Sequence, residues 1–155
     1  MKNPLRLNQN QFYLIFRTGL GILFLAASWD KILDPKGFAV IIQNYKILPA
    51  VLIQPFALFL PWIEAICGIL LVGGKLTKGA ALIVATLMMI FIIALTINLY
   101  RGLDISCGCF SLSAESKKSA YFYLIRDFGI LCTGLWVLFF KIQSDKILSL
   151  YTASR

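Results

Sequence analysis

Four long apolar stretches divide the chain, and shorter polar segments separate them. The apolar stretches cover residues 12–29, 49–73, 80–99 and 120–140. The third is uninterrupted and has about the length that an α-helix needs to cross a hydrocarbon core of roughly 30 Å. Lipid offers no partners to backbone polar groups, and no ten-residue alternation indicates a β-barrel. The pattern therefore predicts an all-α integral membrane four-helix bundle, with one domain over residues 1–155.

The polar segments carry a few local signals. Within residues 30–48, Asp34-Pro35 favours a turn and residues 37–42 are expected to form a short interfacial helix. In the second apolar stretch, Pro61 predicts a kink in a helix that continues back toward Pro49. Residues 100–119 are predicted to be a polar loop, and the tail from Lys141 onward a short amphipathic or frayed end.

Composition supports the membrane assignment. Of the 155 residues, 59% are hydrophobic and 14% are charged, whereas a soluble domain carries roughly 25% charged residues. No histidine is present, which removes the commonest zinc ligand and the usual general base, and we expect no metal site. The net charge of +8 includes no basic run interleaved with aromatic residues, so we expect no nucleic-acid partner.

Four crossings place both termini on one side of the membrane, together with the turn at residues 74–79. This side carries seven basic residues: Lys2, Arg6, Lys75, Lys78, Lys141, Lys146 and Arg155. The opposite side carries six: Lys31, Lys36, Lys46, Arg101, Lys117 and Lys118. The excess favours cytoplasmic termini. The loop at residues 100–119 would then face an oxidising exterior, where disulfides persist.

That loop contains Cys107-Gly108-Cys109. A disulfide between these cysteines would close a very small ring, whereas relaxed bridges separate their Cα atoms by about 5.5–6 Å. Strained, exposed bridges are the ones that take part in thiol–disulfide exchange, and Gly108 tolerates the unusual dihedral angles. The nearby Arg101 could stabilise a thiolate. Two free thiols, or part of a metal site, are the alternative interpretations.

Four ionisable residues interrupt the apolar stretches: Arg17, Glu64, Arg126 and Asp127. Each costs several kcal/mol at bilayer depth unless it is paired or hydrated. Arg126 is expected either to reach the interface or to meet Glu64 across the bundle. Pairs that hold the helices together are the first interpretation, and a proton or electron pathway is the alternative.

Two further cysteines, Cys67 and Cys132, lie within apolar stretches. Buried cysteines usually behave as small hydrophobic residues. The alternative is a second redox pair that passes electrons from Cys107 and Cys109 to a quinone or another carrier.

A series of motifs spans almost the whole chain: Arg17, Gly19, Lys31, Asp34-Pro35, Phe38, Tyr45, Leu48-Pro49, Leu60-Pro61, Glu64, Gly68, Arg101-Gly102, Cys107-Gly108-Cys109-Phe110 and Arg126-Asp127. In this order, the series resembles the MauE branch of the DoxX-like membrane proteins. The likeness is sharpest at the two cysteines. Ser111 departs from the family pattern, which often has glycine there.

The resemblance implies a four-helix protein of the bacterial inner membrane. MauE is associated with maturation of the disulfide-rich small subunit of methylamine dehydrogenase in the periplasm. By that likeness, Cys107 and Cys109 would exchange with a periplasmic thioredoxin-like or disulfide-containing protein. The supporting residues would be Arg101, Gly108, Glu64, Arg126, Asp127 and Lys31. The layout is also similar, by analogy only, to quinone-linked thiol oxidases of the DsbB and vitamin-K-reductase type.

Two other functions stay open. One is a non-catalytic scaffold or chaperone-like subunit for a secreted or redox protein, in which the cysteines need not change redox state. The other is a small-molecule transporter, which rests only on the intramembrane charges, because no inverted repeat is evident.

Overall fold

The computed structural model describes residues 4–101 and 120–153, and every regular element in those ranges is an α-helix. The elements are α1 (Pro4–Leu33), α2 (Pro35–Asn44), α3 (Ala50–Gly73), α4 (Thr77–Tyr100) and α5 (Ala120–Ala153). Of these, α1, α3, α4 and α5 each contain a segment long and apolar enough to cross a membrane. The all-α fold with four candidate spans is therefore confirmed.

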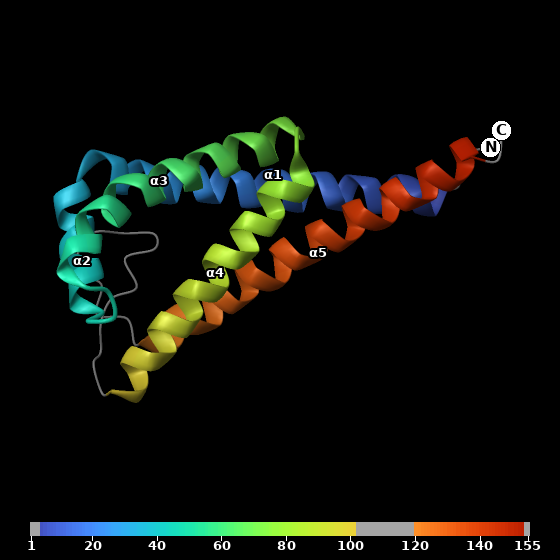
Figure 1. Cartoon of the computed structure of the whole chain (residues 1–155). Helices are drawn as coiled ribbons and strands as arrows, with labels where there is room; N and C mark the ends of the chain where they lie inside the picture. Colours follow the sequence, from blue (N-terminus) through green and yellow to red (C-terminus); the bar gives the residue numbers. More distant parts are fainter. Residues whose placement is uncertain (1–3, 102–119, 154–155) are drawn as a thin grey trace.

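The four long helices form two packed pairs (Figure 1). α1 lies antiparallel along α3, α4 lies antiparallel along α5, and the pairs diverge from the α3–α4 turn. We call the end with that turn the apex. We call the opposite end, where α2, the end of α4 and the start of α5 lie, the mouth. The start of α1 and the end of α5 both extend past the apex, in agreement with the prediction of termini on one side.

Two glycines allow α1 and α3 to touch. A Cβ atom on Gly21 would lie 2.8 Å from the carbonyl oxygen of Gly68, and one on Gly68 would lie 2.9 Å from that of Gly21. Small residues at a membrane helix interface permit this close backbone approach, and van der Waals packing then stabilises the pair.

Apolar side chains fill the space among the four spans. The main cluster includes Leu20, Phe24, Cys67, Leu71, Val84, Met88 and Val137. A second cluster joins α2 to α3 through Phe38, Ala39, Ile42, Ile53 and Ala57. The outward faces of the spans are apolar as well, as expected where lipid rather than water surrounds them.

α2 confirms the short helix predicted for residues 37–42. It begins one residue after Asp34, whose carboxylate accepts a hydrogen bond of 2.9 Å from the Gly37 amide. Pro35 occupies the first turn, where its missing N–H costs nothing. The apolar face of α2 packs on α3, and Lys36, Gln43 and Asn44 are exposed.

The ends of two helices differ from the prediction. α1 continues to Leu33 instead of ending at residue 29, and α5 continues to Ala153 instead of ending near residue 140. Asp145 supports the extension of α5, because it pairs with Lys141 one turn earlier at 3.0 Å and with Lys78 of α4 at 2.7 Å. α3 is one helix from Ala50 to Gly73, which confirms the expected continuation past Pro61 toward Pro49; the kink at Pro61 stays a prediction.

Arg17 contacts the C-terminal end of α3 at the apex. Gly74, which caps α3, adopts a left-handed conformation with φ of 69°. The Arg17 guanidinium donates a hydrogen bond of 3.4 Å to the Val72 carbonyl and lies so close to Gly74 that a side chain there would clash with it. A cation at a helix C-terminus interacts favourably with the helix dipole. The first intramembrane charge therefore has a structural role.

Candidate functional site

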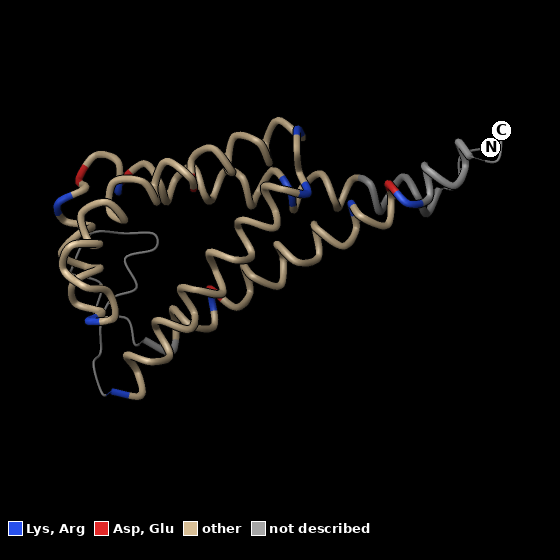
Figure 2. The backbone as a smooth tube through the Cα atoms, in the orientation of Figure 1, with Lys and Arg blue, Asp and Glu red and all other residues tan. Residues whose placement is uncertain are grey.

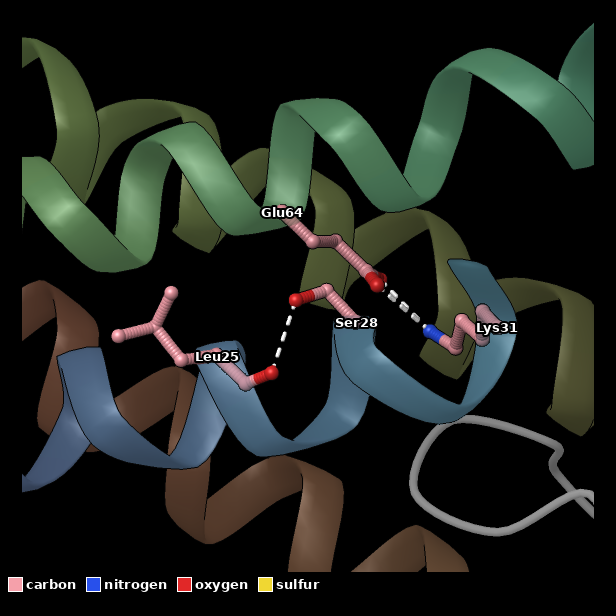
Figure 3. Close-up of polar contacts among 4 residues, drawn as sticks. All are labelled: Leu25, Ser28, Lys31 and Glu64. Carbon is pink, nitrogen blue, oxygen red and sulfur yellow. Dashed lines mark hydrogen bonds and ion pairs between the residues drawn. The ribbon is translucent and has the colours of Figure 1, made fainter. Parts of the chain in front are cut away.

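An ion pair lies almost completely buried between α1 and α3. The Lys31 ammonium donates hydrogen bonds of 2.9 Å and 2.7 Å to the two carboxylate oxygens of Glu64 (Figure 3). Their side chains are only 1% and 2% exposed. A buried charge needs this degree of compensation, because an unpaired one would carry its full desolvation cost.

The antiparallel arrangement explains why these two side chains meet. Lys31 follows the glycine contact by nearly three turns of α1, and Glu64 precedes it by about one turn of α3. Side chains lean toward the N-terminus of their own helix. Lys31 therefore leans back toward the glycine contact while Glu64 leans toward the mouth, and their charged ends converge.

Two aromatic rings complete the surroundings of the ammonium. The Lys31 Nζ atom lies 5.0 Å from the ring centroid of Phe38 in α2 and 5.5 Å from that of Phe91 in α4. These separations are within the range of cation–π attraction. One ammonium on α1 thus contacts residues of α2, α3 and α4. Beside it, the buried hydroxyl of Ser28 donates to the Leu25 carbonyl at 2.9 Å and is satisfied within α1 (Figure 3).

A second ion pair is formed by neighbours on α5. The Arg126 guanidinium donates bonds of 3.0 Å and 2.8 Å to one carboxylate oxygen of Asp127. Asp127 is fully buried, whereas Arg126 is 27% exposed and lies over the Tyr123 ring.

Tyr45, which follows α2, also belongs to this group. It is buried, and burial raises the pKa of its phenol, with the negative charge of Asp127 adding to the rise. We call Lys31, Tyr45, Glu64, Arg126 and Asp127 the buried polar cluster. Its members lie on α1, α3 and α5 and on the residue after α2, and within it the contacts of Lys31 join α1 to α2, α3 and α4.

The structure places the predicted site residues as follows. Lys31, Glu64, Arg126 and Asp127 form two ion pairs, Lys31 with Glu64 and Arg126 with Asp127. A contact with Glu64 was one of the two expectations for Arg126, and the structure pairs Arg126 with Asp127 instead. Arg101 is exposed at the end of α4. Cys107, Gly108 and Cys109 lie outside the described residues.

Cys67 and Cys132 are free and face different surroundings. Cys67 is buried in the main core, and Cys132 is exposed on α5. No Cα atom of α3 lies within 8 Å of one in α5, whereas a disulfide requires Cα atoms about 4.4–6.8 Å apart. In this arrangement the two thiols cannot bond directly to each other.

Sequence reasoning missed the burial of Lys31, because it ended the first helix at residue 29. One signal could have found it: Leu20, Phe24, Ala27 and Lys31 recur at the spacing of a single helix face. Within residues 4–101 and 120–153, no group of three Cys, Asp or Glu side chains gathers as a metal site would require.

These features define the class: a multi-pass helical membrane protein whose charged interior groups compensate one another. The sequence model of the family described as "Methylamine utilisation protein MauE" matches residues 9–140. The chain therefore belongs to the MauE family.

Curated relatives agree with this assignment. The chain is 33% identical over 119 residues to the methylamine utilization protein MauE of Methylophilus methylotrophus, covering 76% of this chain and 63% of the relative. It is 38% identical over 120 residues to MauE of Paracoccus denitrificans, covering 77% and 64%. It thus spans less than two thirds of the length of either relative. No solved structure matches.

Proposed function

We propose that this protein presents Cys107 and Cys109 to the bacterial periplasm as a dithiol/disulfide pair. The pair would support thiol–disulfide exchange during maturation of a periplasmic partner. The partner that we propose is a periplasmic thioredoxin-like or disulfide-containing protein. The MauE relatives are named for methylamine utilization. Membership of that family and four candidate spans support the membrane setting.

The observation that carries the proposal is the location of the two attachment points of the cysteine segment. α4 ends and α5 begins at the mouth (Figure 1). The end of α4 and the start of α5, which flank the cysteine segment in the sequence, therefore lie at the same end as α2. The contacts of Lys31 with Glu64, Phe38 and Phe91 hold α1, α2, α3 and α4 against one another, so we assign Lys31 and Glu64 a positioning role. Arg101 is exposed where the segment begins, where its charge would favour a thiolate.

The charge of the two ends supports an outward-facing mouth. At the apex, the described basic residues that are at least partly exposed number five: Arg17, Lys75, Lys78, Lys141 and Lys146 (Figure 2). At the mouth, the described basic residues that are at least partly exposed number four: Lys36, Lys46, Arg101 and Arg126. Basic residues are enriched on the cytoplasmic side, so the apex would be cytoplasmic and the mouth periplasmic.

The exchange can be written with its electrons balanced. A client thiolate attacks the Cys107–Cys109 disulfide, a mixed disulfide forms, and one cysteine leaves as a thiolate. The second client thiolate then attacks the mixed disulfide, so that the client is oxidised and the protein holds a dithiol. Re-forming the bridge passes two electrons and two protons to an acceptor, for which we propose a membrane quinone.

Cysteine labelling and trapping test the proposal. A membrane-impermeant maleimide applied to spheroplasts should label the reduced pair, and the Cys107→Ser and Cys109→Ser variants should accumulate mixed disulfides with a client. Cys67→Ser and Cys132→Ser are matched controls that should leave both results unchanged. Labelling only after the inner membrane is opened would overturn the proposal.

The same variants separate redox chemistry from a scaffold. A scaffold should support partner maturation when both Cys107 and Cys109 are serine, whereas a redox protein should not. Client disulfide content, measured in the presence of each variant, provides the readout. Full maturation with the double variant would exclude the exchange mechanism.

A further inference from the structure

The apex carries a basic surface next to aromatic side chains. Its cations come from three separate elements: Arg17 on α1, Lys75 and Lys78 around the α3–α4 turn, and Lys141 and Lys146 on α5. Asp145 is the described carboxylate among them, and it pairs with Lys78 and Lys141. The surface therefore keeps most of its positive charge, and Figure 2 shows it gathered where the turn meets α1 and α5.

An aromatic cluster lies between α1 and α5 in the same region. The rings of Tyr13 and Phe140 stack at 5.0 Å, and Trp136 contacts Phe140 at 5.6 Å and Phe16 at 5.4 Å. Trp and Tyr side chains are enriched at the level of the lipid headgroups, and the cluster contains Trp136 and Tyr13. The aromatic cluster therefore places the neighbouring cations at the membrane–water boundary.

A largely apolar groove opens beside these rings. It has a volume of about 550 Å³ and is lined by Phe12, Phe16, Cys132, Thr133 and Trp136. The Arg17 guanidinium lies 5.8 Å from the ring centroid of Tyr13. Tyr13 stacks on Phe140, which in turn stacks on the groove residue Trp136, so ring contacts connect the groove to the basic surface. A cationic surface and an adjoining apolar groove are the two features that a phospholipid requires, one for its headgroup and one for an acyl chain.

The α3–α4 turn adds an exposed apolar residue at the same level. Leu76 is 77% exposed and adopts a left-handed conformation with φ of 49°. This conformation costs a non-glycine residue about 1–2 kcal/mol. It holds an apolar side chain outward between Lys75 and Lys78, as expected where a turn meets both headgroups and acyl chains.

We propose that the apex is a binding surface for an anionic phospholipid. The headgroup phosphate lies against the basic residues of the apex, and an acyl chain occupies the groove between α1 and α5. The proposed lipid surface shares no residue with the proposed chemistry of Cys107 and Cys109. Lipid binding can therefore fail while the thiol chemistry holds, and the reverse.

Lipid titration of the purified full-length chain in mild detergent tests the proposal. Phosphatidylglycerol should raise the melting temperature at a lower concentration than phosphatidylcholine. Each lysine near an anionic surface strengthens binding roughly fivefold, so Lys75→Gln combined with Lys146→Gln should shift the phosphatidylglycerol midpoint roughly 25-fold. Higher salt should shrink the difference between the two lipids.

Matched variants at the other end provide the control. Lys36→Gln combined with Lys46→Gln removes two exposed cations at the mouth and should leave the midpoint unchanged. Trp136→Ala removes part of the groove and should weaken both lipids. Equal midpoints for the two lipids, an equal shift from the mouth variant, or the same stabilisation by inorganic phosphate at matched concentration would overturn the proposal.

Discussion

The Lys31–Glu64 ion pair offers the most direct test of what holds α1 against α3. Lys31→Met keeps most of the length of the side chain but removes its charge. Glu64 would then be left 2% exposed without its partner, and breaking a buried pair in this way costs about 3–5 kcal/mol. The attraction to the Phe38 and Phe91 rings is lost as well. We expect the melting temperature to fall by roughly 10 °C or more.

A second substitution separates the ion pair from packing. Combining Lys31→Met with Glu64→Gln removes the uncompensated carboxylate, so the double variant should be more stable than Lys31→Met alone. The exposed Lys78–Asp145 pair is the matched control. Water screens it, and Lys78→Met should change the melting temperature far less.

Thermal unfolding followed by circular dichroism in detergent is a suitable assay for all of these variants. A loss of less than about 1 kcal/mol for Lys31→Met, or a shift of only about 2–4 °C, would refute the reasoning. So would a double variant whose loss equals the sum of the two single losses, because the two side chains would then act independently.

Two further predictions concern the glycine contact and the alkaline limit of stability. Gly68→Ala should destabilise the protein by about 1–3 kcal/mol, because the new Cβ would lie 2.8 Å from Leu25 Cγ and 2.9 Å from the Gly21 carbonyl oxygen. The control is Gly129→Ala, whose new Cβ would have nothing within 4 Å and which should slightly stabilise α5. Equal effects of the two substitutions on the free energy of unfolding would contradict this view. The pKa of Tyr45 is raised in the folded state by burial and by Asp127, so the phenol binds its proton more tightly there than in the unfolded chain. The resulting stability is present below pH 10 and is lost as the pH rises further; Tyr45→Phe should flatten that decline in a series of melts, and an unchanged slope would count against it.

The spans could be predicted because lipid imposes a simple rule on them. Every backbone group must be satisfied within a helix, so long apolar stretches such as residues 80–99 leave few alternatives. The short helix after Asp34 was predictable for a local reason, since Asp34-Pro35 starts a helix and the following residues form one apolar face. The exact ends were harder, because α1 continues through the charged residue Lys31.

The pairing of the buried charges could not be derived in the same way. Sequence shows which charges are expensive in a membrane, but their partners depend on how two helices cross. That crossing is set by the contact between Gly21 and Gly68, two residues far apart in the chain. From the sequence, Lys31 was assigned to a loop, because the groups that compensate its charge lie on other helices. These are the Glu64 carboxylate on α3 and the rings of Phe38 on α2 and Phe91 on α4.

The glycine contact and the ion pair have a joint consequence for how the chain assembles in the bilayer. Sliding α1 past α3 by a turn of about 5.4 Å would move larger side chains into the close contact between Gly21 and Gly68. The same slip would separate Lys31 from Glu64, and breaking a buried ion pair costs about 3–5 kcal/mol. The glycine contact and the ion pair therefore select the same register of α1 on α3.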